Sequence, residues 1–375
     1  MSPANSERSI EGRRSRDVGS SQSVRAVNFE HSREFVPILR QLKVSLLVST
    51  YQAGKVAVIG TDASGLSLSF HNFQQAMGIA ADAERLAVGA HRSVWILRAA
   101  KDLCERIDPP GRYDACYLTR AAHYTGNIHV HELAWSGNDL WCVNTLFSCL
   151  CTLNDDVSFV PRWQPRFISE LQPQDRCHLN GLAMEHGQPR YVTAMAESNQ
   201  AEGWRPTKAT SGVLIDVPSG QTLSGGLAMP HSPRLANSRL FVLNSGCGTL
   251  ETVDRDSGKR EVVETVPGYA RGLAVCGQFA FVGMSKGRET SVFGGVPIAE
   301  KRNHLRCAVA VIDLHSGRSV AFLEFKSGVE EIFDVQVLPD TALPVVSGPY
   351  PDEDETQPIW VIPRSVSLHS ETDFG

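Results

Sequence analysis

The sequence predicts an all-β fold and, within that class, a six-bladed β-propeller. Helical periodicity is scarce after residue 43, whereas short apolar runs typical of β-strands recur between Gly, Asn, Asp and Pro residues. Six of these runs also share a common pattern. A repeat of about 50 residues built from short strands is typical of a ring of blades.

The repeat is anchored on a short strand of the form Gly-Leu-Ala or a variant of it. The six segments are MGIAAD, HELAWSG, NGLAMEHG, PRLANS, RGLAVCG and FDVQVLPD. Their anchor residues are Gly78, Glu132, Gly181, Arg234, Gly272 and Asp334, with spacings of 54, 49, 53, 38 and 62 residues. We predict that each anchor strand is the innermost strand of one blade.

Two further strand-like runs follow each of the first five anchors. The pairs are LAVGAH with SVWIL, LWCVNT with SCLCTLN, RYVTAMAE with GVLIDV, LFVLNSG with TLETVD, and AFVGMSK with CAVAVID. No comparable pair follows the sixth anchor, but an additional pair, SLLVSTYQ and KVAVIG, precedes the first. The N-terminal pair therefore supplies the strands that the sixth repeat lacks.

Both chain ends are thus expected to contribute to the last blade. A ring must close on itself, and a blade shared by the two ends also removes an exposed strand edge. We predict an inner strand near residues 331–338 and outer strands from residues 43–73, with a seventh, degenerate blade as the alternative. The expected organisation is a disordered leader at 1–30, one propeller domain at 31–340, and a partly ordered tail at 341–375.

Composition and charge exclude several classes of protein. The chain of 375 residues has 36 Lys and Arg against 41 Asp and Glu, a formal net charge of −5, which argues against a dedicated nucleic-acid-binding protein. No stretch approaches the about 18 consecutive apolar residues of a membrane span. Nine cysteines without a Cys-x-x-Cys pair and a polar N-terminus favour a cytoplasmic location. We expect neither a nucleic-acid nor a membrane partner.

Four motifs resemble an uncharacterised bacterial family of conserved hypothetical proteins, over about residues 35–340. They are DRCHLNGLA, MPHSPR, PGYARGLA and NTLFSCL. The anchor pattern itself resembles the innermost strands of NHL-type and related six-bladed propellers, a group that includes gluconolactonases and peptidylglycine amidating lyase. Several enzymes of that group hold a divalent metal at the mouth of the central channel. The resemblance therefore implies the fold and suggests a class of site, but it does not imply a reaction.

Two sets of inner-strand residues are predicted to face the channel. Side chains alternate along a strand, so residues three and one before each anchor share a face. The first set is Gln75, His129, His178, His231, Tyr269 and Glu331; the second is Met77, His131, Asn180, Pro233, Arg271 and Phe333. Three consecutive blades thus present histidine at one structural position.

The histidines predict a metal site at the mouth of the channel. Neutral imidazole is a common ligand of transition metals, and three protein ligands leave positions open for water or substrate. We take His129, His178 and His231 as candidate ligands, with His131 as a fourth ligand or a supporting residue, and the ion as Zn, Mn, Fe or Cu. The alternative is a polar, water-filled channel whose histidines bond to one another and to solvent.

The remaining channel residues supply candidate acid–base and substrate groups. Glu331 and Tyr269 are the candidates for proton transfer beside a metal-bound water. Arg271 suits a substrate carboxylate, or alternatively forms an ion pair with Glu331 or Glu330. The candidate substrate-binding residues are Arg271, Asn180 and Gln75 on the inner strands and Asn144, Asn244 and Lys286 on turns at the same face.

Two functional hypotheses follow from these residues. The first is a metal-dependent enzyme that acts on a small polar, carboxylate-bearing molecule or a modified peptide. It would be a lyase or hydrolase with Zn or Mn, and an O₂-dependent oxidase or oxygenase with Fe or Cu. The second is a non-catalytic propeller that binds a protein or peptide partner through its loops.

Overall fold

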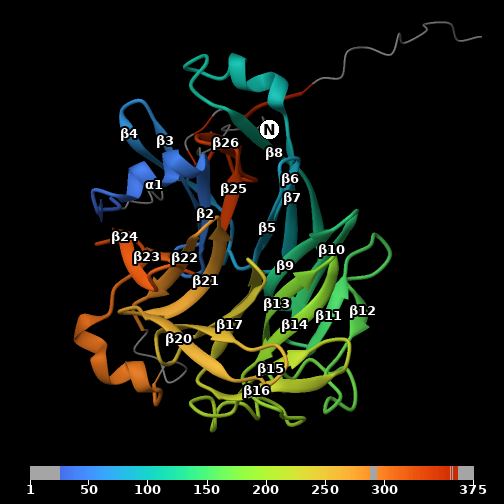
Figure 1. Cartoon of the computed structure of the whole chain (residues 1–375). Coiled ribbons are helices and arrows are strands. Elements are labelled where there is room, and N and C mark those ends of the chain that lie inside the picture. Colours follow the sequence, from blue (N-terminus) through green and yellow to red (C-terminus); the bar gives the residue numbers. More distant parts are fainter. Residues whose placement is uncertain (1–25, 288–293, 355, 357, 362–375) are drawn as a thin grey trace, which may run out of the picture.

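The computed structural model describes residues 26–287, 294–354, 356 and 358–361, and within them six sheets surround a central axis in chain order (Figure 1). Blade 1 contains β5 (Ile79–Ala81), β6 (Arg85–Gly89), β7 (Ser93–Ala99) and β8 (Ala115–Tyr124). Blade 2 contains β9 (Val130–Ser136), β10 (Asp139–Asn144), β11 (Cys149–Thr152) and β12 (Val160–Trp163). Blade 3 contains β13 (Leu179–Glu185), β14 (Gln188–Ala194), β15 (Gly212–Asp216) and β16 (Gln221–Leu227).

The second half of the ring continues the same arrangement. Blade 4 contains β17 (Pro230–Ala236), β18 (Arg239–Asn244), β19 (Thr249–Val253) and β20 (Arg260–Thr265). Blade 5 contains β21 (Tyr269–Cys276), β22 (Phe279–Ser285), β23 (Ala308–Asp313) and β24 (Arg318–Phe325). Blade 6 contains β25 (Asp334–Pro339), β2 (Val44–Thr50), β3 (Lys55–Asp62) and β4 (Gly65–Asn72). The prediction of six blades is confirmed, and the described residues form no seventh sheet.

Strands from both chain ends close the ring, as predicted. In blade 6, β25 is the inner strand and pairs antiparallel with β2, from Val44 opposite Pro339 to Ser49 opposite Asp334. The hydroxyl of Ser49 accepts a hydrogen bond from the backbone N–H of Asp334 at 3.0 Å and donates one to the carbonyl of Met77 in blade 1 at 2.5 Å. The two chain ends are thus joined to each other and to the next blade.

A separate apolar cluster fills each junction between neighbouring blades. Between blades 6 and 1, for example, Val56 and Val58 pack with Leu86 and Tyr117. Side chains on both faces of each sheet are therefore buried against the neighbouring blades. This hydrophobic burial holds the blades in a fixed ring. This ring is the rigid scaffold for the inner-strand residues.

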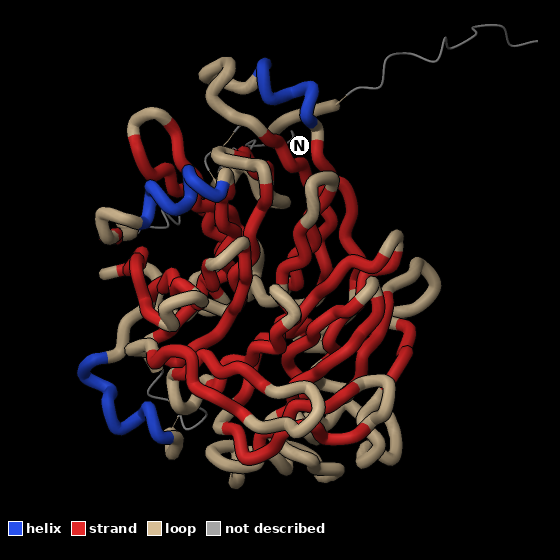
Figure 2. Tube along the Cα trace, viewed as in Figure 1, coloured by secondary structure: helices blue, strands red, loops and turns tan. Residues whose placement is uncertain are grey.

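Short additional elements lie at the periphery of the ring (Figure 2). They are helix α1 (Phe35–Leu42), the 3₁₀ segments η1 (Lys101–Arg106) and η2 (Pro297–His304), strand β1 (Phe29–His31) on β24, and strand β26 (Pro344–Ser347), which pairs parallel with β8. Within the described part of the chain, no helix is long and apolar enough to cross a membrane. Most of the expected leader, residues 1–25, lies outside the described residues.

The segment after the sixth anchor also contacts the ring beyond β26. The carboxylate of Asp354 accepts hydrogen bonds from the backbone and side-chain N–H groups of Asn72, at 2.8 and 2.6 Å. The ring of Tyr350 packs edge-on against Trp95 with centroids 5.9 Å apart. Residues 344–354 therefore tie the outer strand of blade 1 to the outer strand of blade 6.

Candidate functional site

A pocket of about 200 Å³ lies at the centre of the ring, and the inner strands supply most of its lining. Nine of the twelve residues predicted to face the channel line it: Met77, His129, His131, His178, His231, Tyr269, Arg271, Glu331 and Phe333. Tyr51, Met195, Trp204, Met229, Ser245, Ser285 and Lys286 complete the wall. The ring therefore brings together residues that lie up to about 280 positions apart in the sequence.

The backbone is irregular where the histidines enter the pocket. His129 and His178 have φ angles of 54° and 50°, in the left-handed region that residues other than glycine and asparagine rarely adopt. The pairing of the inner strands of blades 2 to 5 also shifts register near these positions. Such strain persists only where the surrounding structure enforces it, and it is concentrated at functional sites.

His131 is held in one tautomer. Its Nδ1 lies 3.1 Å from the carbonyl of His129 and 2.8 Å from Oγ1 of Thr145. Since the Thr145 hydroxyl donates its proton to the carbonyl of Leu179 at 2.6 Å, its oxygen accepts from Nδ1–H of His131. Nε2 therefore keeps its lone pair. Burial, with smaller effects from His178 and Arg271, places the pKa of His131 well below its usual value, so the ring is neutral.

His231 repeats this arrangement two blades further on. Its Nδ1 lies 2.9 Å from the carbonyl of Met229 and 2.9 Å from Oγ of Ser245, and the Ser245 hydroxyl donates to the carbonyl of Ala270. Burial again places the pKa of His231 well below its usual value, with Arg271 acting in the same direction. His231 is therefore also a neutral imidazole with an available Nε2.

His178 is oriented by a carboxylate that the sequence analysis did not single out. Nδ1 of His178 lies 2.8 and 3.0 Å from the two carboxylate oxygens of Asp175. The same carboxylate accepts a hydrogen bond from Nε1 of Trp204 at 3.1 Å, and the Trp204 ring packs against His178 with centroids 4.3 Å apart. The signal was present in the motif DRCH, where an acidic residue precedes the histidine by three positions.

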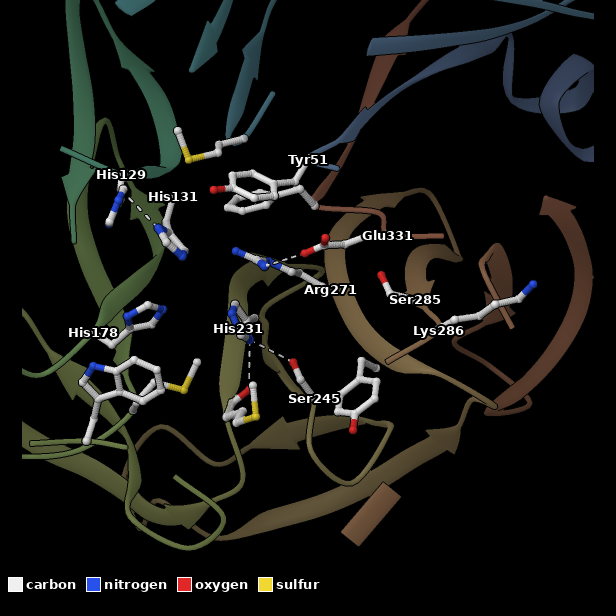
Figure 3. A pocket seen from close by; sticks show the side chains of 16 residues that line it. Tyr51, His129, His131, His178, His231, Ser245, Arg271, Ser285, Lys286 and Glu331 are labelled. Carbon is white, nitrogen blue, oxygen red and sulfur yellow. Dashed lines mark hydrogen bonds and ion pairs between the residues drawn. The ribbon is translucent and has the colours of Figure 1, made fainter. Parts of the chain in front are cut away.

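Figure 3 shows His129, His131 and His178 on one side of the pocket and His231 nearer its centre, beside Ser245. The rings of His131 and His178 meet edge to face with centroids 4.9 Å apart. Among the described residues, however, no three His, Cys, Asp or Glu side chains form a group that could hold a metal ion by themselves. In this geometry the side chains do not converge on one point.

Charged groups occupy the other side of the pocket. Figure 3 shows Glu331 and Lys286 opposite the histidines, with Arg271 between the two sides. Nη1 of Arg271 lies 3.9 Å from a carboxylate oxygen of Glu331, and its guanidinium carbon lies 3.3 Å from the centre of the Phe333 ring. The ion pair with Glu331, which was the alternative to a substrate-binding role for Arg271, is therefore present, and both groups line the pocket together with Tyr269.

Four of the candidate substrate-binding residues do not line this pocket. Oδ1 of Asn180 accepts a hydrogen bond from Thr193, Oδ1 of Asn144 accepts one from the backbone of Phe147, and Asn244 bonds to Ala228 and Glu251. Gln75 lines a neighbouring surface pocket with Tyr51 and His91. Lys286 and Arg271 are the substrate-binding candidates that the structure brings to the histidines.

Below the pocket, the anchor residues close the channel. Blades 1, 3 and 5 have glycine at this position, and a Cβ at Gly78 would lie only 2.8 Å from Cα of Glu132. Blades 2, 4 and 6 carry charges instead: Nη2 of Arg234 lies 2.6 Å from Glu132 and 3.7 Å from Asp334. We call these three residues the charged plug. Burial raises the pKa of Glu132 to about 8 and also raises that of Asp334, against the opposing effect of Arg234.

Comparison with known proteins supports the fold and the family. A chain of the nidogen/laminin complex is 11% identical, with a TM-score of 0.50 over 79% of this chain and 99% of that one. A protein of unknown function from Bacteroides caccae is 12% identical, with a TM-score of 0.49 over 79% of this chain and 98% of that one. At 11% identity, the likeness to the chain of the nidogen/laminin complex shows the fold alone.

Family membership comes from the sequence match. No curated protein matches the sequence, whereas residues 33–346 match the family described as Domain of unknown function (DUF4915). The expectation of an uncharacterised family with a propeller fold is thus confirmed. That the four short motifs mark this family stays a prediction. Because the match spans most of the chain, this protein belongs to the DUF4915 family.

Proposed function

We propose that the central pocket is the active site of a metal-dependent enzyme that acts on a small polar, carboxylate-bearing molecule or a modified peptide. The observation that carries the proposal is the orientation of His131, His178 and His231. Each bonds through Nδ1 to a carbonyl or carboxylate oxygen, which leaves Nε2 as a donor to the pocket. Histidines that bind metals are oriented in this way by their surroundings.

The donor set fits a transition metal in its chemistry. Two of the three rings are held neutral by burial, as a metal ligand must be. Binding would require the rings to move together, since the described His, Cys, Asp and Glu side chains do not form such a group as they stand. A bound ion would supply a Lewis acid or an activated water, with Zn or Mn, or O₂ chemistry, with Fe or Cu.

The other side of the pocket would bind and protonate the substrate. Arg271, between the histidines and the opposite wall, and Lys286, on that wall, would attract a carboxylate. Glu331 and Tyr269 would hold or move a proton, and Trp204, packed over His178, would exclude water from that side. With the charged plug across the axis, substrate would enter and product would leave from the histidine side.

Thermal unfolding of the untagged, chelator-treated chain tests this proposal. We expect divalent transition metals to raise the unfolding temperature of the wild type, and small carboxylic acids to raise it further only when metal is present. His178→Ala should remove both effects, whereas His315→Ala, on an exposed turn, should keep them. Ligands that bind regardless of chelator and of His178 would support the protein- or peptide-binding alternative instead.

A further inference from the structure

A second pocket adjoins the central one at its histidines. Its volume is about 500 Å³, and it shares His129, His178 and Trp204 with the lining of the central pocket. The connection before β13 and the connection between β14 and β15 supply most of the rest: Pro173, Gln174 and Asp175 from the first, and Ala201, Glu202 and Arg205 from the second. We call this second cavity the outer pocket.

Both connections are longer than the blades require. Residues 164–178 join β12 to β13, and residues 195–211 join β14 to β15, which pair antiparallel within one blade. Paired strands are usually joined by about two to five residues. Long connections on a rigid scaffold are where binding residues are concentrated, so the length of these two segments calls for a role beyond turning the chain.

Backbone strain is concentrated in the lining of the outer pocket. Four of its ten lining residues have φ angles in the left-handed region although none of them is glycine: His129 at 54°, Asp175 at 47°, His178 at 50° and Glu202 at 49°. Only a few per cent of residues other than glycine adopt this conformation. Such strain persists where the surrounding structure enforces it, and it clusters where ligands are held.

A buried arginine fixes the two connections to each other. Arg176 is 6% exposed, and its Nε donates to Oε1 of Gln174 at 2.9 Å while its Nη1 donates to Oδ1 of Asn199 at 2.8 Å. The backbone N–H of Glu202 also donates to the carbonyl of Gln174 at 3.0 Å. The outer pocket is therefore preformed, and a ligand that enters it does not have to order these segments.

The chemistry of the outer pocket suits an uncharged group. Its charged side chains are bonded to one another: Nη2 of Arg205 lies 2.8 Å from Glu202, and Asp175 lies 2.8 Å from Nδ1 of His178. The remaining lining is apolar or neutral and consists of Leu146, Pro173, Gln174, Ala201 and Trp204. An apolar surface with one amide fits a peptide segment better than a saccharide, whose many hydroxyl groups would lose their bonds to water there.

We propose that the outer pocket is a second binding subsite, and that the ligand is a short peptide whose C-terminal carboxylate lies at Arg271 and Lys286 in the central pocket. The preceding residues would pass His129 and His178 and place an uncharged side chain in the outer pocket. At about 200 Å³ the central pocket is smaller than the about 300–1,000 Å³ typical of ligand sites, and the outer pocket adds the space that a peptide needs. This inference rests on the proposed function for the carboxylate anchor, but not for the metal.

Equilibrium dialysis of the untagged full-length chain against two pools of acetylated tripeptides tests the inference. One pool has free C-terminal carboxylates and the other has amidated C-termini, and the chain is used both after chelator treatment and after metal loading. We expect peptides from the first pool to be retained, peptides from the second not to be, and Arg271→Met to retain neither.

A variant that fills the outer pocket locates the peptide. Ala201→Trp adds a large side chain at an exposed position of its lining, so it should weaken the retained peptides at least about tenfold in isothermal titration. Ala121→Trp is the matched control, because Ala121 is also exposed but lies on β8 of blade 1, and it should bind these peptides as the wild type does.

The outcomes separate this inference from the proposed function. If the wild type binds single carboxylic acids but no peptide, or if Ala201→Trp binds peptides as tightly as the wild type, the inference is wrong and the proposed function stands. Equal retention of amidated peptides, or an oligosaccharide of uronic acids that binds in place of peptides, also overturns it. Peptide binding that needs Arg271 and an open outer pocket but no metal upholds the inference and removes the metal from the proposed function.

Discussion

The pocket and the charged plug beneath it lie on the same inner strands, within three residues of each other, yet they satisfy their polar groups differently. In the plug, Arg234 is paired with two buried carboxylates, Glu132 and Asp334. In the pocket, Nδ1 of each oriented histidine is bonded, and in the neutral rings of His131 and His231 the Nε2 atom keeps its lone pair. Buried polar groups that are paired with one another stabilise the fold. Oriented side chains that keep an unbonded donor or acceptor atom are typical of sites that bind a ligand.

This difference predicts that changes in the two layers have separate effects. A change in the plug should lower the free energy of unfolding, and a change in the pocket should lower ligand affinity while the fold persists. Stability and ligand affinity, measured on the same variants, test whether the two effects are separate.

The largest expected effect is on stability, from Arg234→Met. At about pH 9, above the raised pKa of Glu132, removing the guanidinium leaves both carboxylates, Glu132 and Asp334, buried without their cation, at a cost of about 3–5 kcal/mol in the free energy of unfolding. Urea unfolding of the metal-free chain measures it. Arg255→Met is the control, because Arg255 also lies 2.8 Å from a glutamate but is exposed, where a pair contributes about 0–1 kcal/mol. Equal losses of unfolding free energy in the two variants would show that the charged plug stabilises the fold no more than an exposed ion pair does.

The next effect is on metal affinity, from alanine at His131, His178 or His231. Each substitution removes one nitrogen donor, so we expect the wild-type metal affinity to fall by about 100-fold or more, while the far-ultraviolet circular dichroism stays unchanged. Isothermal titration of the chelator-treated protein gives the affinity. Substituting His129, which lines the pocket but is not one of the three oriented histidines, should have a smaller effect. A metal affinity that survives all three substitutions would place the ion elsewhere.

Asp175→Asn should weaken metal binding less than the loss of a histidine. The asparagine keeps the shape but removes the negative charge that accepts from both His178 and Trp204. Changes of this kind behind a ligand typically cost about 10–100-fold in affinity. The same titration measures it, and Asp175→Ala should cost more than Asp175→Asn. If neither variant changes the affinity, Asp175 supports the fold only.

The smallest expected effect is on the pH dependence of stability, through Glu132 in the charged plug. Burial raises the pKa of Glu132 from 4.5 to about 8, so between these values the folded state keeps a proton that the unfolded chain releases. The stabilisation from this proton is complete below about pH 4.5 and is lost as the pH rises through about 8. Glu132→Gln carries no such proton, so its stability should fall less between pH 5 and pH 8.5. Urea unfolding at both pH values compares them, and equal slopes would refute the raised pKa.

The blades and the inward-facing residues were predictable because they depend on local signals. Strand alternation and turn residues mark each element, and the repeat aligns Met77, His131 and Arg271 at one position without any knowledge of tertiary contacts. The closure by both chain ends followed from counting strands. These features are fixed by periodicity, which the sequence displays directly.

The partners of the site residues were not predictable in the same way. Asp175 reaches His178 because both residues have positive φ angles, of 47° and 50°, which alternation cannot foresee. The 102-residue separation of Glu132 and Arg234 hides their ion pair. Asn144 and Asn244 looked like pocket residues, but Oδ1 of Asn144 accepts from the turn that follows it, and the amide of Asn244 bonds to Ala228 and Glu251. Side-chain pairing depends on tertiary placement, not on the repeat.

The most direct test of the account is the metal content of the untagged full-length chain, measured by mass spectrometry of the elements after purification and metal loading. The account predicts about one transition-metal ion per chain in the wild type and in Arg255→Met, and a small fraction of that in a His131→Ala, His178→Ala double variant that remains folded. A wild type without bound metal, or a double variant that binds as much as the wild type, would contradict it.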